Sequence, residues 1–222
     1  PIASTGIDLI GVGDLATPQR LNRSLQSFDS IVSWYGANRP EFRNTLIELG
    51  VECQFHPALP GKARSEHVTD FFARQVGAPE GLVPHFKVGP WTPRDAIVMH
   101  PFSGSPLKNW PLNLYRELAA RLPFQVEWTA GTEEKLPEAI RFASLAELGT
   151  WIRGAYLYIG NDSGITHLAA AAGVPTLALF GSVSRLNWAP RGDNVTVLYS
   201  TLLERLEIQI VLDAVNRLLD SL

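Results

Sequence analysis

From residue 96 onward, short apolar runs alternate with amphipathic helical patterns, and this alternation constrains the fold more than any other feature. Strands that alternate with helical patterns of about ten to fifteen residues are typical of βαβ units, whose strands pair in parallel. The pattern predicts an α/β fold with a doubly wound parallel sheet. The predicted strands cover Ala96–His100, Phe124–Thr129, Tyr156–Ile159, Thr176–Phe180 and Val195–Tyr199, and the predicted helices cover Leu112–Leu122, Ser144–Arg153, Ser163–Ala172 and Glu204–Leu219.

The N-terminal part shows a weaker pattern of the same kind. Prolines and glycines crowd residues 78–94, which is typical of a linker. We therefore expect a partial N-terminal α/β domain over residues 1–88 and a second domain over 89–222, closed by a helix over 204–219. In the first domain we predict strands at Ile7–Ile10, Ser30–Trp34 and Val51–Phe55 and helices at Glu41–Leu49 and Ser65–Val76, with Ser65 as the cap of the second helix.

Composition excludes several classes of protein. The net charge of the 222 residues is −3, and a non-specific nucleic-acid binder would show a basic excess. Cys53 is the only cysteine, so the sequence can form no internal disulfide, and a reducing cytoplasm is the simplest setting. No apolar run reaches the length of a membrane span. The chain is expected to have no nucleic-acid partner and at most peripheral membrane contact.

The strongest candidate site follows the predicted strand that ends at Ile159. Asp162, Ser163 and Gly164 form a tight turn there and begin an Ala-rich helix. The unpaired N–H groups and positive dipole end of a helix start attract anions, and Gly164 leaves room for close approach. His167 lies four residues after Ser163 and could face the same ligand. The alternative is that the turn only caps the helix and His167 only packs.

Two further loops follow predicted strands. In the first, Ser103 and Gly104 leave room for a phosphate and Lys108 supplies a positive charge; the alternative is a solvated loop anchored by Trp110. In the second, Glu133 or Glu134 stands just beyond a strand end and could accept hydrogen bonds from ribose hydroxyls; the alternative is a solvent-facing acidic turn.

These features together resemble glycosyltransferase family 9, whose best-known members are the ADP-heptose:lipopolysaccharide heptosyltransferases. The resemblance covers about residues 96–200 and is weak before them. It is carried by the segments Gly160–Thr176, Leu179–Gly181, Lys108–Pro111 and Trp188–Pro190.

The resemblance implies the two-domain GT-B fold, with a Rossmann-type C-terminal domain that binds the nucleotide-sugar donor. In this fold the final helix crosses back to the N-terminal domain, so we expect the helix over 204–219 to contact residues before 95. It implies that Asp162, Ser163, Gly164 and His167 contact the donor's diphosphate or sugar. Ser103 and Lys108 match the family's phosphate contacts, and Glu133 or Glu134 its ribose contact, in a register that the sequence leaves open.

The N-terminal part departs from the family pattern. Family members have a larger N-terminal domain in which a Gly-Asp turn supplies the proposed catalytic base. Asp14 is the candidate here, and the alternative is a turn aspartate beside two glycines with no catalytic role. Because the sequence begins at Pro1 and this part is short, we expect the acceptor-binding portion to be shortened or to lie partly outside the chain.

The expected function is inverting transfer of a sugar, heptose in the family's best-known members, from a nucleoside diphosphate donor such as ADP-heptose to a lipopolysaccharide-core or similar glycan acceptor. No Asp-x-Asp run is present, so we expect no metal or other cofactor. The enzyme would work in the cytoplasm, free or at the inner face of the inner membrane. The alternatives are another nucleotide-sugar enzyme on this fold, such as an epimerase, or a donor-binding module without turnover.

Overall fold

The computed structural model describes residues 6–12, 19–61, 66–87, 89–181 and 185–221. The chain divides into two compact units, residues 1–78 and 79–222.

The first unit contains a small parallel sheet. Strands β1 (Ile31–Ser33) and β2 (Cys53–Phe55) pair in parallel. The other elements are the 3₁₀-helix η1 (Ile7–Leu9) and the helices α2 (Gln19–Leu25), α3 (Pro40–Glu48) and α4 (Val68–Gln75). Its core is a small apolar cluster formed by Ile10, Leu21, Leu25, Phe42, Leu46 and Val51.

Two predictions in this unit were wrong in detail. Residues 7–10 form no strand, because Gly6 and Gly11 adopt left-handed conformations on either side and the Leu9 amide bonds back to Gly6, which closes a 3₁₀ turn. The last helix of the unit begins at Val68, where the His67 side chain accepts from the Thr69 amide as the cap. Ser65, the predicted cap, lies outside the described residues.

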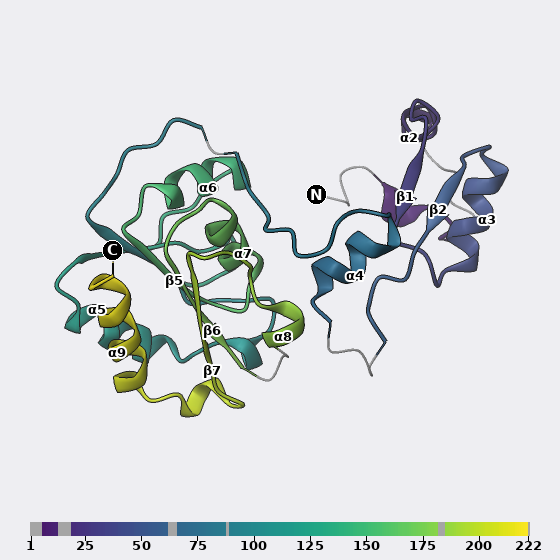
Figure 1. Cartoon of the computed structure of the whole chain (residues 1–222). Coiled ribbons are helices and arrows are strands. Elements are labelled where there is room, and N and C mark those ends of the chain that lie inside the picture. The colour runs from purple at the N-terminus through teal and green to yellow at the C-terminus, as the bar shows by residue number, and fades with distance from the viewer. Residues whose placement is uncertain (1–5, 13–18, 62–65, 88, 182–184, 222) are drawn as a thin grey trace. The chain divides into compact units, whose positions relative to one another are not determined.

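The second unit is a doubly wound sheet of five parallel strands in the order β4-β3-β5-β6-β7. Figure 1 labels β5, β6 and β7 of this sheet. Short apolar runs become strands here because both faces of a covered parallel sheet are buried. The strands are β3 (Ala96–His100), β4 (Gln125–Trp128), β5 (Leu157–Asn161), β6 (Thr176–Phe180) and β7 (Val195–Tyr199). The helices are α5 (Leu112–Arg121), α6 (Leu145–Arg153), α7 (Gly164–Ala171), α8 (Arg185–Trp188) and α9 (Ile208–Leu219), with 3₁₀ turns η2 (Pro106–Lys108) and η3 (Leu203–Arg205).

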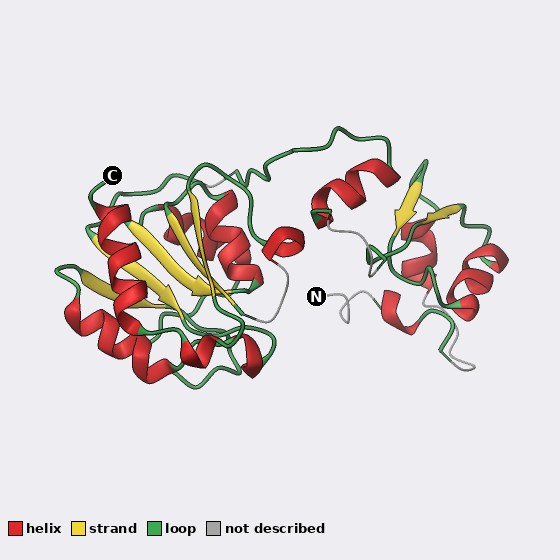
Figure 2. Ribbon diagram, turned by 60° about the horizontal axis from the view of Figure 1, so that its bottom comes forward, coloured by secondary structure: helices red, strands yellow, loops and turns green. Residues whose placement is uncertain are grey.

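Helices cover both faces of this sheet (Figure 2). On one face, α5 and α9 pack over Ile97, Met99 and their neighbours in the sheet. On the other, α6 and α7 pack over Val98 and Tyr158. Alternate residues of β3 therefore serve opposite cores, as strand geometry requires. The predicted capping box of α6, formed by Ser144 and Glu147, is confirmed.

The closing helix differs from its prediction at its start. The chain leaves the helical conformation at Leu206 and Glu207, so the expected single helix is η3 followed by α9. The break allows Leu206 to be buried while its carbonyl oxygen accepts the Trp110 indole N–H at 2.9 Å. The buried face of α9 belongs to the core of residues 97–215 within the second unit, and its packing on residues before 95 stays a prediction.

Gly160 is needed where β5 meets α7. A Cβ there would lie 2.5 Å from the Tyr158 hydroxyl and 2.8 Å from Thr166 Oγ1, both in the core. We expect Gly160→Ala to lower the free energy of unfolding by about 1–3 kcal/mol, the usual cost of overpacking. Gly104→Ala is the matched control, because a Cβ at Gly104 meets nothing within 4 Å. Urea denaturation that found the two variants equally stable would contradict this packing.

Candidate functional site

The loops that follow β3 and β5 open at the same edge of the sheet, as predicted. The two strands are parallel neighbours, and their register pairs His100 with Gly160 at their carboxyl ends. The chain runs from β3 outward to β4 on one side, and from β5 outward to β7 on the other. The order therefore reverses between β3 and β5, and such switch points are where doubly wound sheets bind ligands.

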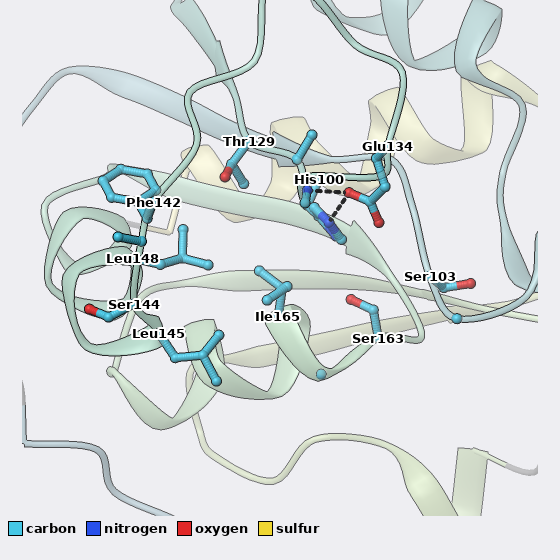
Figure 3. Close-up of a pocket in the computed structure, with 15 residues that line it drawn as sticks. His100, Ser103, Thr129, Glu134, Phe142, Ser144, Leu145, Leu148, Ser163 and Ile165 are labelled. Atoms are coloured by element: carbon cyan, nitrogen blue, oxygen red, sulfur yellow. Dashed lines mark hydrogen bonds and ion pairs between the residues drawn. The ribbon is translucent and has the colours of Figure 1, made fainter. Parts of the chain in front are cut away.

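A cavity of about 350 Å³ lies at this switch point. Its lining changes character from one end to the other (Figure 3): Phe142, Leu145 and Leu148 form an apolar end, and Ser103 and Ser163 lie at the other. The apolar end comes from the start of α6 and the segment before it, and the polar end from the loops after β3 and β5. An elongated ligand with one apolar and one polar part would fit this division.

Ser163 and Gly164 form the floor of the polar end. Ser163 is the N-cap of α7, and its side chain accepts from the Thr166 amide. Gly164 is exposed, and a Cβ there would meet nothing within 4 Å. The first-turn amides of α7 therefore stand at an open place beside the cavity, where the helix dipole favours negative charge.

Lys108 and Asp162 form an ion pair beside the cavity. Lys108 Nζ lies 2.8 Å from Asp162 Oδ2, and their side chains are 33% and 9% exposed. Neither residue lines the cavity, but Asp162 directly precedes Ser163. The pairing brings the one basic residue of the β3 loop to the α7 turn and leaves part of its ammonium group accessible to an incoming anion.

Ser103 holds the shape of the loop after β3. Its hydroxyl lies 2.8 Å from the Ser105 carbonyl oxygen and 2.7 Å from Asn109 Oδ1, and can donate to either. The same side chain reaches the cavity surface beside Gly104. Ser103 therefore organises its own loop and still offers its oxygen to a ligand.

The glutamate pair separates in the structure. Glu134 lines the cavity, whereas Glu133 is exposed and does not. Glu134 Oε2 accepts the Gly131 amide at 2.6 Å and lies 3.3 Å from His100 Nε2. Burial raises the pKa of Glu134, but the hydrogen bonds from His100 and Gly131 and the charge of Arg141 outweigh it, so the pKa is lowered. Glu134 is thus a carboxylate at neutral pH.

His167 lies away from the cavity. Its side chain is exposed, and the residue of α7 that turns inward is Thr166, whose hydroxyl donates to the Asn161 carbonyl oxygen. Asp14, the candidate base, lies outside the described residues.

Asn161 is a residue that our sequence reasoning did not single out. It is fully buried, and its Oδ1 accepts both the Trp110 amide and the Tyr115 hydroxyl at 3.0 Å. It ties the end of β5 to the loop after β3 and so sets the two sides of the site relative to each other. A polar residue at the end of a fully apolar strand was the available signal.

Within the described ranges, no group of three or more His, Cys, Asp or Glu side chains is arranged to hold a metal ion. Across those same ranges, no helix has the length and apolar character needed to cross a membrane.

The sheet order and the cavity at its switch point define a doubly wound α/β protein whose second unit carries a ligand cavity. The chain belongs to glycosyltransferase family 9 (heptosyltransferase), whose family model matches residues 61–211.

Curated relatives match only part of the chain. Lipopolysaccharide heptosyltransferase 3 of Escherichia coli is 43% identical over 49 residues, which are 22% of this chain and 14% of that protein. The chain thus matches far less than two thirds of this relative's length.

Solved structures match over more of the chain and show the fold. The E. coli ADP-heptose LPS heptosyltransferase II is 20% identical with a TM-score of 0.69, and the match covers 91% of this chain and 80% of that one. The iron-containing dodecameric glycosyltransferase TibC of enterotoxigenic E. coli is 15% identical with a TM-score of 0.52, over 76% and 63%. These neighbours support a GT-B-like α/β fold.

Proposed function

We propose that this chain binds a nucleoside diphosphate sugar, ADP-heptose, through its second unit, and transfers the sugar to a lipopolysaccharide-core or similar glycan acceptor. The observation that carries the proposal is the polarity of the cavity. An apolar end suits a nucleobase, a fixed carboxylate suits ribose hydroxyls, and a helix start beside an ammonium group suits a diphosphate. Membership of the family and the ADP-heptose named for one structural neighbour support the same donor.

In this proposal each residue has a defined part. Phe142 and Leu148 hold the base, and Glu134, rather than Glu133, accepts from the ribose. Ser103, Ser163 and Gly164 surround the diphosphate. Preorganised donors and charges of this kind stabilise the negative charge that develops on a departing diphosphate.

Lys108 neutralises the departing diphosphate from the edge of the site, and Asp162 keeps Lys108 in place. His167, exposed on α7, would contact the sugar outside the cavity. A base must also take the proton of the acceptor hydroxyl, and Asp14 is our proposal for it. Transfer would then invert the anomeric centre and need no metal; the iron reported for TibC makes a chelator the necessary control. The acceptor is a glycolipid or glycan, and the setting is the cytoplasmic side of the membrane.

Gly164 offers a test of the diphosphate position that leaves the fold intact. We expect Gly164→Asp to weaken ADP binding about tenfold or more relative to Gly164→Asn, because the carboxylate would face the phosphates at short range. Both side chains have room at this exposed helix start. An aspartate near a helix N-terminus also interacts favourably with the helix dipole, so the free energy of unfolding should not fall.

Isothermal titration of both variants with ADP in the presence of EDTA makes the comparison. If the two folded variants bind ADP with equal affinity, the diphosphate does not lie at the start of α7. Turnover of an ADP-sugar with a glycan acceptor then separates an enzyme from a donor-binding module.

A further inference from the structure

Among the residues that the structure describes, Glu134 is the only carboxylate that lines the cavity, and its contacts fall on one of its two oxygens. Both contacts that fix it, from the Gly131 amide and from the His100 ring, fall on Oε2. When hydrogen bonds fix one oxygen of a carboxylate, the second oxygen, here Oε1, stays available as an acceptor and its orientation is fixed. Figure 3 shows the carboxylate of Glu134 above the polar end, with His100 beside it.

His100 reaches this position as the last residue of the buried strand β3. Its side chain is almost completely enclosed, with 5% exposed, and its ring lies edge-on against Phe102. A buried ring at the end of a central strand has little freedom to rotate. It can therefore hold a partner in one place, in a way that a surface side chain could not.

The other ring nitrogen settles which tautomer the histidine adopts. Nδ1 of His100 is buried and has no hydrogen-bond partner. With the proton on Nδ1, that N–H would be buried without an acceptor, and the Nε2 lone pair would face a carboxylate oxygen. An orphaned donor is less well tolerated than an orphaned acceptor. The proton therefore belongs on Nε2, which donates to Glu134.

We propose that His100 is a positioning residue, which holds Glu134 so that its free oxygen accepts a ribose hydroxyl of the nucleotide and lets the site discriminate hydroxylated from deoxygenated ligands. The inference rests on the proposed function, since it takes ADP as the ligand. A carboxylate repels phosphate, so the same contact also orients the nucleotide, with its ribose at Glu134 and its diphosphate at the far polar wall.

The test measures discrimination rather than affinity alone. ADP, 2′-deoxy-ADP and 3′-deoxy-ADP are titrated into the whole chain by calorimetry. A hydrogen bond to a charged acceptor corresponds to about tenfold or more in affinity, so one deoxy ligand should bind that much more weakly than ADP. In His100→Leu this ratio should fall to about two- or threefold. In His100→Gln, whose amide N–H can still reach Glu134, the ratio should stay close to that of the unmodified chain.

Glu134→Gln provides the reference for a lost carboxylate, and urea denaturation confirms that each variant is folded. If His100 only supported the fold, His100→Leu would weaken ADP and both deoxy ligands equally, and an unchanged ratio would overturn the proposal. A ratio that survives in Glu134→Gln would overturn it as well. If the unmodified chain binds no ADP, the proposed function fails and this inference with it, which is a different result from an unchanged ratio.

Discussion

Asn161→Leu should lower the free energy of unfolding by about 2–5 kcal/mol. The substitution keeps the side-chain size but removes the oxygen that accepts the Trp110 amide and the Tyr115 hydroxyl. Each buried donor left without a partner costs about 1–3 kcal/mol. Burial raises the pKa of the Tyr115 phenol well above its usual value, so the hydroxyl stays protonated and is a donor at all ordinary pH values. Urea denaturation of the intact chain measures the loss.

Tyr115→Phe identifies the source of that loss. In the unmodified chain it removes one of two donors to Asn161 and should cost about 1 kcal/mol. In the Asn161→Leu background it should be neutral or stabilising, because it removes a hydroxyl that already lacks a partner. Costs that simply add in the double variant would show that the two side chains do not act through this hydrogen bond.

The strands and helices of the second unit could be predicted because their signals are local. Buried parallel strands are apolar along their whole length, and β3, β5 and β6 are buried at every position. The capping box of α6 can be recognised because its two residues, Ser144 and Glu147, lie within four residues of sequence. Parallel neighbours share an edge, so the meeting of the loops after β3 and β5 also followed from the pattern of strands and helices.

Two elements were predicted wrongly because another interaction overrides the local sequence signal. Residues 204–219 have helical periodicity throughout, but Leu206 must bend inward to meet the Trp110 indole, and the helix restarts at Ile208. Ile7–Ile10 has the composition of a strand, yet only Ile10 is buried, and the turn between two left-handed glycines decides its conformation.

The side-chain pairs of the site could not be read from the sequence, because they depend on the register between strands. His100 meets Glu134 across 34 residues, and Trp110 meets Asn161 across 51. His167 is exposed on α7 and does not line the cavity, so its contact with the donor sugar stays a prediction.

Lys108→Ala should weaken ADP binding by about one to two decades, because a charge-assisted contact to phosphate is worth about 1.5–3 kcal/mol. The ion pair adds a second reason. Removing the ammonium group leaves the Asp162 carboxylate, 9% exposed, without its cation beside the proposed diphosphate position. Part of the loss should therefore come from repulsion by Asp162.

The double variant separates these two contributions. Asp162→Asn added to Lys108→Ala removes the uncompensated carboxylate, so it should recover part of the lost ADP affinity while adenosine binding stays the same. If Asp162→Asn restores nothing in this background, the loss in Lys108→Ala comes from the missing ammonium group alone, and the ion pair has no part in binding.

Calorimetric titration of the unmodified chain and of Lys108→Ala with ADP and with adenosine, in EDTA, tests the central claim most directly. The unmodified chain should bind one ADP per chain without metal and bind adenosine far more weakly, and Lys108→Ala should lose most of the difference between the two ligands. A folded chain that binds no ADP, or that binds ADP equally well with and without Lys108, would contradict the assignment of a diphosphate to this edge of the sheet.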